Sequence, residues 1–225
     1  MIGWLRKVLT RGKPETSHSA HTGIFSRLGD IPGVGYEGHP DIDRRELPRH
    51  NDSPSIKIYS FEGRRVTSVW WDLPNGGGTS QSPASERASF DDRDASPAEV
   101  LRGVHESLEL PGSASDYHFA LMNAYRLLWN HRLREPEVLA EIERLCLLDI
   151  KLVETRPETV RDPGEGSEGA LQVPAFSRLV RLYEREGFME EALDIAHRAA
   201  ALGHGTVELQ RLEARIQELN AEDAS

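Results

Sequence analysis

Residues 176–200 have the sequence FSRLVRLYEREGFMEEALDIAHRAA, which predicts two helices joined by a tight turn. Large side chains recur at helical spacing before a central glycine, and small ones follow it: Phe176, Leu179, Tyr183, Gly187, Ala192 and Ala199. A glycine at this place accepts the left-handed backbone that ends a helix. Alanines let two antiparallel helices approach closely. The stretch therefore predicts a closely packed helical hairpin.

This hairpin resembles a tetratricopeptide repeat in the order of its large residues, its turn glycine and its two alanines. The resemblance covers one repeat-like unit, residues 174–204. It implies a stack of helical hairpins that binds a protein or peptide and carries out no catalysis. It also implies that the first helices of successive hairpins line a common binding face.

The helical pattern continues on both sides of this unit. Helices are predicted over residues 96–109, 115–131, 135–154, 174–186, 188–202 and 206–220. Ser96 and Glu99 have the spacing of a capping box at the start of the first helix. Cys146 lies on the apolar stripe of the third helix and is interpreted as a small core residue. We therefore predict a mainly α protein, in which residues 96–225 form a compact tetratricopeptide-like domain of about six helices.

The first half of the chain is richer in residues that interrupt helices. Residues 1–97 contain 11 of the 19 Gly and 8 of the 13 Pro. Alternating apolar residues predict one β-hairpin over about residues 55–71. The rest of residues 1–74 is expected to be poorly structured, and residues 75–95, rich in Gly and Ser, to be a flexible linker.

Composition and charge exclude several classes of protein. The 225 residues carry a formal net charge of −10, all of it on residues 98–225, which argues against a nucleic-acid partner. The chain has no run of about 18 apolar residues that would span a membrane. Its single cysteine cannot form an internal disulfide, and its start lacks a secretion signal. We therefore expect a cytoplasmic protein that needs no cofactor.

The first half also holds a group of residues that would suit a metal-dependent protein. The weak candidate ligands are His18, His21, His39, Asp41 and Asp43. Because a Gly- and Pro-rich stretch supplies no evident rigid frame, a metal-dependent enzyme or metal-binding protein is an alternative rather than the leading hypothesis. His118, which follows Asp116 at a helix start, is interpreted as a capped structural histidine rather than a general base.

A second alternative comes from the amphipathic pattern of residues 1–13, which places apolar side chains on one helical face and basic ones on the other. Such a helix would contact an anionic membrane surface and make the chain a peripheral membrane protein. We favour the interpretation that this short helix packs on its own protein.

Two rows of polar side chains form the candidate partner-binding site. Each row recurs at helical spacing beside a core stripe, and together they comprise Asn123, Arg126, Asn130, Arg178, Arg181 and Arg185. By the tetratricopeptide resemblance, the two rows would line one groove. Guanidinium and amide donors suit a carboxylate, either in an acidic stretch or at a chain terminus. The leading hypothesis is therefore a non-catalytic adaptor that binds another protein or a peptide.

Overall fold

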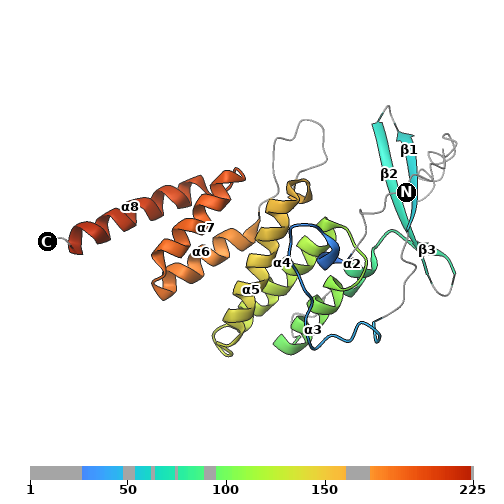
Figure 1. Ribbon diagram of the computed structural model, residues 1–225, viewed down its shortest axis with the longest axis horizontal. Coiled ribbons are helices and arrows are strands. Elements are labelled where there is room, and N and C mark those ends of the chain that lie inside the picture. Colours follow the sequence, from blue (N-terminus) through green and yellow to red (C-terminus); the bar gives the residue numbers. More distant parts are fainter. Residues whose placement is uncertain are drawn as a thin grey trace, which may run out of the picture.

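The computed structural model shows a mainly helical protein with a small antiparallel sheet in its first half, which confirms the predicted fold class (Figure 1). The structure describes residues 27–47, 54–61, 64–73, 76–88, 95–160 and 173–223. Its elements are η1 (Leu28–Asp30), β1 (Ser55–Phe61), β2 (Arg64–Asp72), β3 (Gly78–Thr79), α2 (Pro83–Arg87), α3 (Pro97–Leu108), α4 (Ala114–His131), α5 (Val138–Thr155), η2 (Pro157–Val160), α6 (Pro174–Glu186), α7 (Met189–Ala201) and α8 (Thr206–Asp223).

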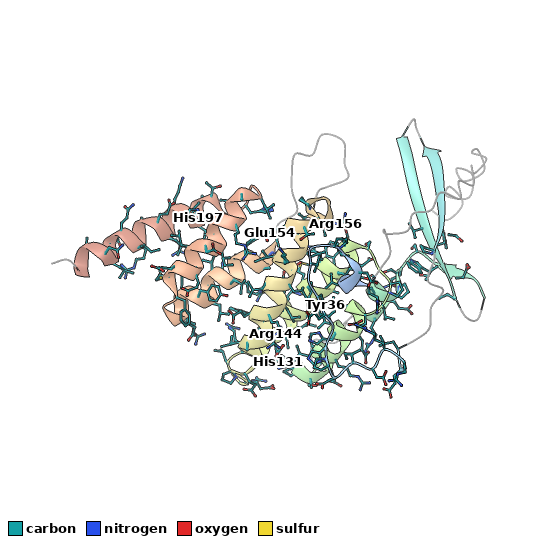
Figure 2. All side chains as sticks on the ribbon, viewed as in Figure 1. Tyr36, His131, Arg144, Glu154, Arg156 and His197 are labelled. Carbon is teal, nitrogen blue, oxygen red and sulfur yellow. The ribbon has the colours of Figure 1, made fainter. Side chains whose placement is uncertain are left out.

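The helices from α3 to α8 form a stack in which each helix packs on the next one along the chain. In Figure 1 the stack runs from α2 and α3 at one side to α8 at the other. An ion pair also connects α5 with α7, which are not consecutive in the chain. Arg198 Nε of α7 donates to Glu154 Oε1 of α5 at 2.8 Å (Glu154 is labelled in Figure 2). Within the described residues after 95, six α-helices occur, the number expected from the sequence.

The helix ends follow from local sequence. At α3, Ser96 Oγ accepts from the Glu99 N–H while the Glu99 carboxylate accepts from the Ser96 N–H, so the predicted capping box is confirmed. At α4, Ser113 and Asp116 make the same exchange, and the helix begins at Ala114, slightly earlier than predicted. At the end of α6, Gly187 has a φ of 85°, the left-handed conformation expected there.

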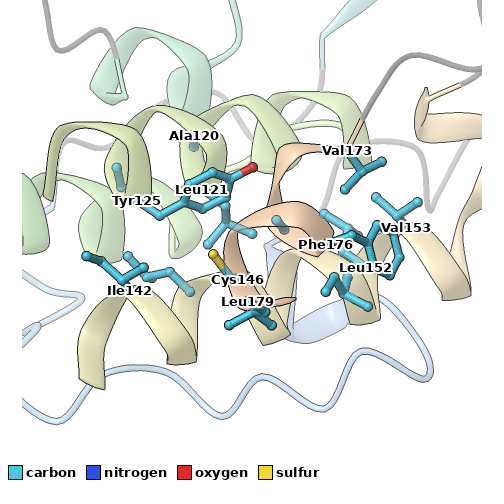
Figure 3. Close-up of a cluster of buried hydrophobic side chains, with 14 of the residues drawn as sticks. Ala120, Leu121, Tyr125, Ile142, Cys146, Leu152, Val153, Val173, Phe176 and Leu179 are labelled. Carbon is cyan, nitrogen blue, oxygen red and sulfur yellow. The ribbon is translucent and has the colours of Figure 1, made fainter. Parts of the chain in front are cut away.

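The core lies where α4, α5 and α6 meet. Figure 3 shows Leu121 of α4, Cys146 of α5 and Leu179 of α6 packed side by side, and each is fully buried. Burial raises the pKa of the Cys146 thiol, which keeps it protonated and unreactive. The interpretation of Cys146 as a small core residue is therefore confirmed.

The predicted hairpin is also confirmed. Strand β1 pairs with β2 in antiparallel register, from Ser55 opposite Trp70 to Phe61 opposite Arg64. Strand β2 begins at Arg64, and the short β3 pairs with its other edge through Trp71 and Thr79. Trp71 is 3% exposed whereas its neighbour Trp70 is 43% exposed, because successive side chains of a strand point to opposite faces.

The prediction that the chain before the hairpin is poorly structured is wrong for residues 28–47, which we call the strap. Leu28, Ile31 and Val34 are buried and belong to the same hydrophobic core as the helices. Tyr36 is half-buried (Figure 2), and Arg44 Nε donates to Glu109 Oε2 at 2.6 Å just beyond α3. The strap contains a 3-10 turn and several glycines of positive φ. Its apolar residues therefore show neither helical nor strand periodicity.

The linker prediction is wrong for residues 82–88, which form α2 and its ends. Ala84 is fully buried, and its carbonyl accepts from Ser107 Oγ of α3 at 2.7 Å. A Cβ on Gly112 would lie only 2.6 Å from the Ala84 Cβ, so this contact depends on two small residues. Small residues are common in linkers and in close helix contacts alike, which is why composition misled the prediction here.

Two sequence predictions remain, on the N-terminal helix and on membrane spans. The amphipathic helix predicted for residues 1–13 lies outside the described residues, as do His18 and His21. Among the helices that the structure describes, none combines the length and the apolar composition needed to cross a bilayer.

The hairpin of α6 and α7 generates a stability prediction. Ala192 is fully buried, so Ala192→Glu places a carboxylate in a contact only wide enough for a methyl group. We expect the unfolding free energy to fall by at least about 3 kcal/mol, measured by chemical denaturation. Ala201→Glu puts the same residue at an exposed position of α7 and is the control, expected to change stability little. Equal stability of the two variants would contradict this packing.

Candidate functional site

Helices α4 and α6 are brought together by aromatic and guanidinium side chains. The guanidinium carbon of Arg178, on α6, lies 4.8 Å from the ring centroid of Trp129 and 5.5 Å from that of Tyr125, both on α4. The guanidinium carbon of Arg132 lies 4.5 Å from the Trp129 centroid. Two guanidinium groups therefore rest on one indole, an arrangement stabilised by the ring quadrupole.

Two more arginines extend this group. Arg126 is one helical turn before Trp129, and Arg181 is one turn after Arg178; both side chains are exposed. We call Arg126, Arg132, Arg178 and Arg181 the arginine cluster.

The arginine cluster differs from most arginines of the described chain in having no carboxylate partner. Ten others lie within 4 Å of a carboxylate oxygen: Arg27, Arg44, Arg45, Arg87, Arg102, Arg144, Arg185, Arg198, Arg211 and Arg215. In the parts that the structure describes, no ion pair reaches a member of the cluster; Arg126 donates to Asn123 Oδ1 at 3.4 Å, and Arg132 to the Trp129 carbonyl at 2.6 Å. The cluster is a local positive surface on an acidic chain.

Burial and neighbouring positive charges both affect the pKa of Arg178, the central arginine of the cluster. Arg178 is half-buried, and burial lowers the pKa of its guanidinium, with Arg132 and Arg181 acting in the same direction. Because the free protein supplies this cation with aromatic faces instead of a counter-charge, an incoming anion would gain a favourable electrostatic interaction there.

The partner-binding residues predicted from the sequence differ in their contacts and in their exposure. Arg178, on α6, contacts Tyr125 and Trp129 of α4, and Arg126 and Arg181 are exposed on the same two helices. Asn130 is exposed on α4, whereas Arg185 is 63% exposed and lies 3.9 Å from its neighbour Glu186. Whether the two rows line one groove stays a prediction.

Sequence reasoning missed the aromatic base of the site. Tyr125, Trp129 and Arg132 recur at i, i+4 and i+7, a spacing that places them on one face of α4. That spacing was a usable signal. It was overlooked because Tyr125 lies next to the core stripe and its ring contributes to the core and to the site alike.

The candidate metal ligands do not converge in the part of the chain that the structure describes. His39 Nδ1 lies 3.9 Å from Asp41 Oδ2, and Asp43 faces Arg45 instead, at 3.5 Å. No group of three potential ligands that could hold a metal ion occurs among the described residues. His18 and His21 are outside them.

His39 contributes instead to a cavity between the strap and the helices, with a volume of about 760 Å³. Its ring stacks on that of His105 of α3, with centroids 4.1 Å apart. His105 is 5% exposed, and neither of its ring nitrogens has a hydrogen-bond partner among the described residues. Burial, helped by His39 and Arg144, lowers the pKa of His105 to about 4, so the ring is neutral near pH 7.

A buried polar network lies directly beneath the arginine cluster. His118 Nδ1 of α4 is 2.6 Å from Asp149 Oδ1 of α5, and the Tyr125 hydroxyl donates to Asp149 Oδ2 at 3.2 Å. His118 and Asp149 are 1% and 0% exposed, which leaves no access for a substrate. Burial raises the pKa of Asp149, while His118 and Tyr125 act against this change. His118 is therefore structural, as predicted, but its partner is Asp149 rather than a helix cap.

Comparisons with protein-family models, with curated proteins and with solved structures give no match to this chain.

The His118–Asp149 pair generates a second stability prediction. His118→Leu leaves the Asp149 carboxyl without its imidazole partner in a dry interior, so we expect a loss of about 3–5 kcal/mol of unfolding free energy. The double variant His118→Leu with Asp149→Leu removes both polar groups and should recover part of that loss, as measured by urea denaturation. A double variant less stable than His118→Leu would contradict this account.

The buried His105 ring predicts a pH dependence of stability. Its pKa is about 4 in the folded chain and about 6.5 when unfolded, so between these values only the unfolded state takes up the proton. Stability should therefore fall as pH is lowered from 6.5 towards 4. His105→Phe keeps an aromatic ring against His39 and removes this titration. Urea denaturation at several pH values should show a flatter profile for the variant, and parallel profiles would contradict the assignment.

Proposed function

We propose that this chain is a non-catalytic cytoplasmic adaptor that binds an acidic segment of another protein on the surface formed by α4 and α6. The observation that carries the proposal is the arginine cluster: four guanidinium groups with no carboxylate partner among the described residues, two of them resting on Trp129, in a chain of net charge −10. Localised positive charge on an acidic chain favours an acidic partner by complementarity.

The tetratricopeptide resemblance supports the same surface. Helices α4 and α6 are the first helices of the two hairpins α4–α5 and α6–α7, and in that family the corresponding helices line the binding face. The contact of Arg178 with Tyr125 and Trp129 shows that side chains of α4 and α6 meet.

The chemistry of a stacked guanidinium also suits this role. When the flat face of an arginine lies on an aromatic ring, its N–H groups point outward in a fixed fork that matches a carboxylate. The aromatic base reduces the side-chain entropy lost on binding, because the guanidinium is already held in place. A side-chain carboxylate or a chain terminus would each fit such a donor set.

An affinity-capture experiment tests the proposed function. The full chain carrying Arg126→Glu and Arg181→Glu reverses the charge of two exposed members of the cluster and should keep its fold. We expect capture of the partner from cell lysate, quantified by mass spectrometry, to fall at least tenfold, with weaker salt dependence of the remainder.

The matched control makes the same change of charge elsewhere. Arg45→Glu with Arg215→Glu alters two exposed arginines on the strap and on α8, and should leave capture unchanged. The proposal predicts that proteins lost with the cluster variant and retained with the control have acidic segments. Identical capture profiles for the two variants would remove α4 and α6 from the binding site.

A further inference from the structure

The arginine cluster concentrates more positive charge than one carboxylate would balance. Arg178 and Arg132 rest on the same indole, with guanidinium carbons 4.8 and 4.5 Å from its centroid. Arg181, one turn along α6, is near enough to act on the pKa of Arg178. Two cations therefore lie on one indole with a third one helical turn from Arg178, and no carboxylate of the described chain lies within 4 Å of any of them.

A phosphate monoester matches this charge better than a carboxylate does. Near pH 7 it carries a charge of about −1.5 to −2 and offers three acceptor oxygens, against one charge and two oxygens for a carboxylate. Arginine forks bind such oxygens in pairs, and the contact with Trp129 restrains two of the forks before a ligand binds. The extra oxygen gives the third guanidinium a partner of its own.

The surroundings of the cluster favour a single phosphate over a chain of them. Glu135 and Glu137 lie in the connection from α4 to α5, and residues 98–225 carry the whole net charge of −10, so carboxylates outnumber basic groups in the helical part of the chain. A nucleic acid or an anionic membrane would bring its further phosphates against these carboxylates. A single phosphorylated side chain on the partner segment brings no further phosphates and avoids that repulsion.

We propose that Arg132, Arg178 and Arg181 recognise a phosphorylated side chain on the partner protein, so that binding is switched on by phosphorylation. This inference rests on the proposed function, since it names the chemical group by which the partner is recognised. Arg178 is the anchor because aromatic rings of α4 hold its guanidinium, and Arg181, being exposed, is free to close on the bound group.

The first experiment compares peptide pools that differ in one residue. Three immobilised pools of random flanking sequence carry a central phosphoserine, glutamate or serine, and binding of the full chain to each is measured. We expect the phosphoserine pool to bind at least tenfold more protein than either of the others. Equal binding to the phosphoserine and glutamate pools would overturn the phosphate inference while leaving an acidic partner in place.

Variants show whether the pool binds at the proposed site. Arg178→Lys keeps the positive charge but loses the planar fork, and should reduce binding to the phosphoserine pool at least fivefold. Arg45→Glu with Arg215→Glu again serves as the control and should bind as the unaltered chain does. Full binding by Arg178→Lys, with its fold verified by circular dichroism, would overturn the assignment to this cluster.

A second experiment uses proteins captured from lysate and distinguishes the adaptor function from the phosphate inference. Lysate treated with phosphatase before capture should lose the proteins that depend on Arg126 and Arg181, whereas lysate with phosphatase inhibitors should retain them. If capture depends on these arginines but not on phosphorylation, the adaptor function stands and the phosphate inference fails. Stronger binding to RNA or to vesicles of phosphatidylserine than to the phosphoserine pool would also overturn it.

Discussion

Tyr125 connects the interior of the helical stack with its surface, and the candidate site depends on how this residue is held. Its hydroxyl donates to Asp149 of α5, and the face of its ring lies 5.5 Å from the guanidinium carbon of Arg178 on α6. A buried tyrosine hydroxyl needs a partner, and Asp149 in turn needs His118. One side chain therefore links α4 to α5 and to α6.

These polar contacts fix the relative positions of α4 and α5 more closely than the apolar contacts around them do. Leucine and alanine contacts tolerate small shifts between helices, whereas a hydrogen bond of 2.6 Å between His118 and Asp149 tolerates far less. The rotation of α4 that buries His118 also presents Trp129 to α6. The positions of the guanidinium groups on the surface are thus fixed by a network that no ligand touches.

The helices were predictable because their signals are local. Periodic apolar residues, the Ser96–Glu99 capping box and Gly187 each act within a few positions of the chain, and the structure has helices where they indicated. The hairpin was likewise visible from strict alternation in β1 and β2. Of the candidate site, the arginines of α6 were visible for the same reason, since they recur along one helix.

The strap and α2 could not be predicted because their structure comes from distant contacts. Leu28, Ile31 and Val34 have irregular spacing, and only the surface of the helical stack gives them a place to be buried. Nor does any local pattern pair Arg44 with Glu109, 65 positions away. The aromatic base under Arg178 was missed for a related reason: Trp129 acquires its role only when α6 is beside it.

The strap also has a consequence for the order of folding. The strap precedes the helices of the stack in the chain, so Leu28 has no surface to be buried against until those later residues have folded. Contacts that join residues so far apart in sequence close slowly, because the intervening chain must lose entropy before it gains any burial. The apolar residues of the strap therefore stay exposed until the helices form, and a chaperone would meet them on the newly made chain.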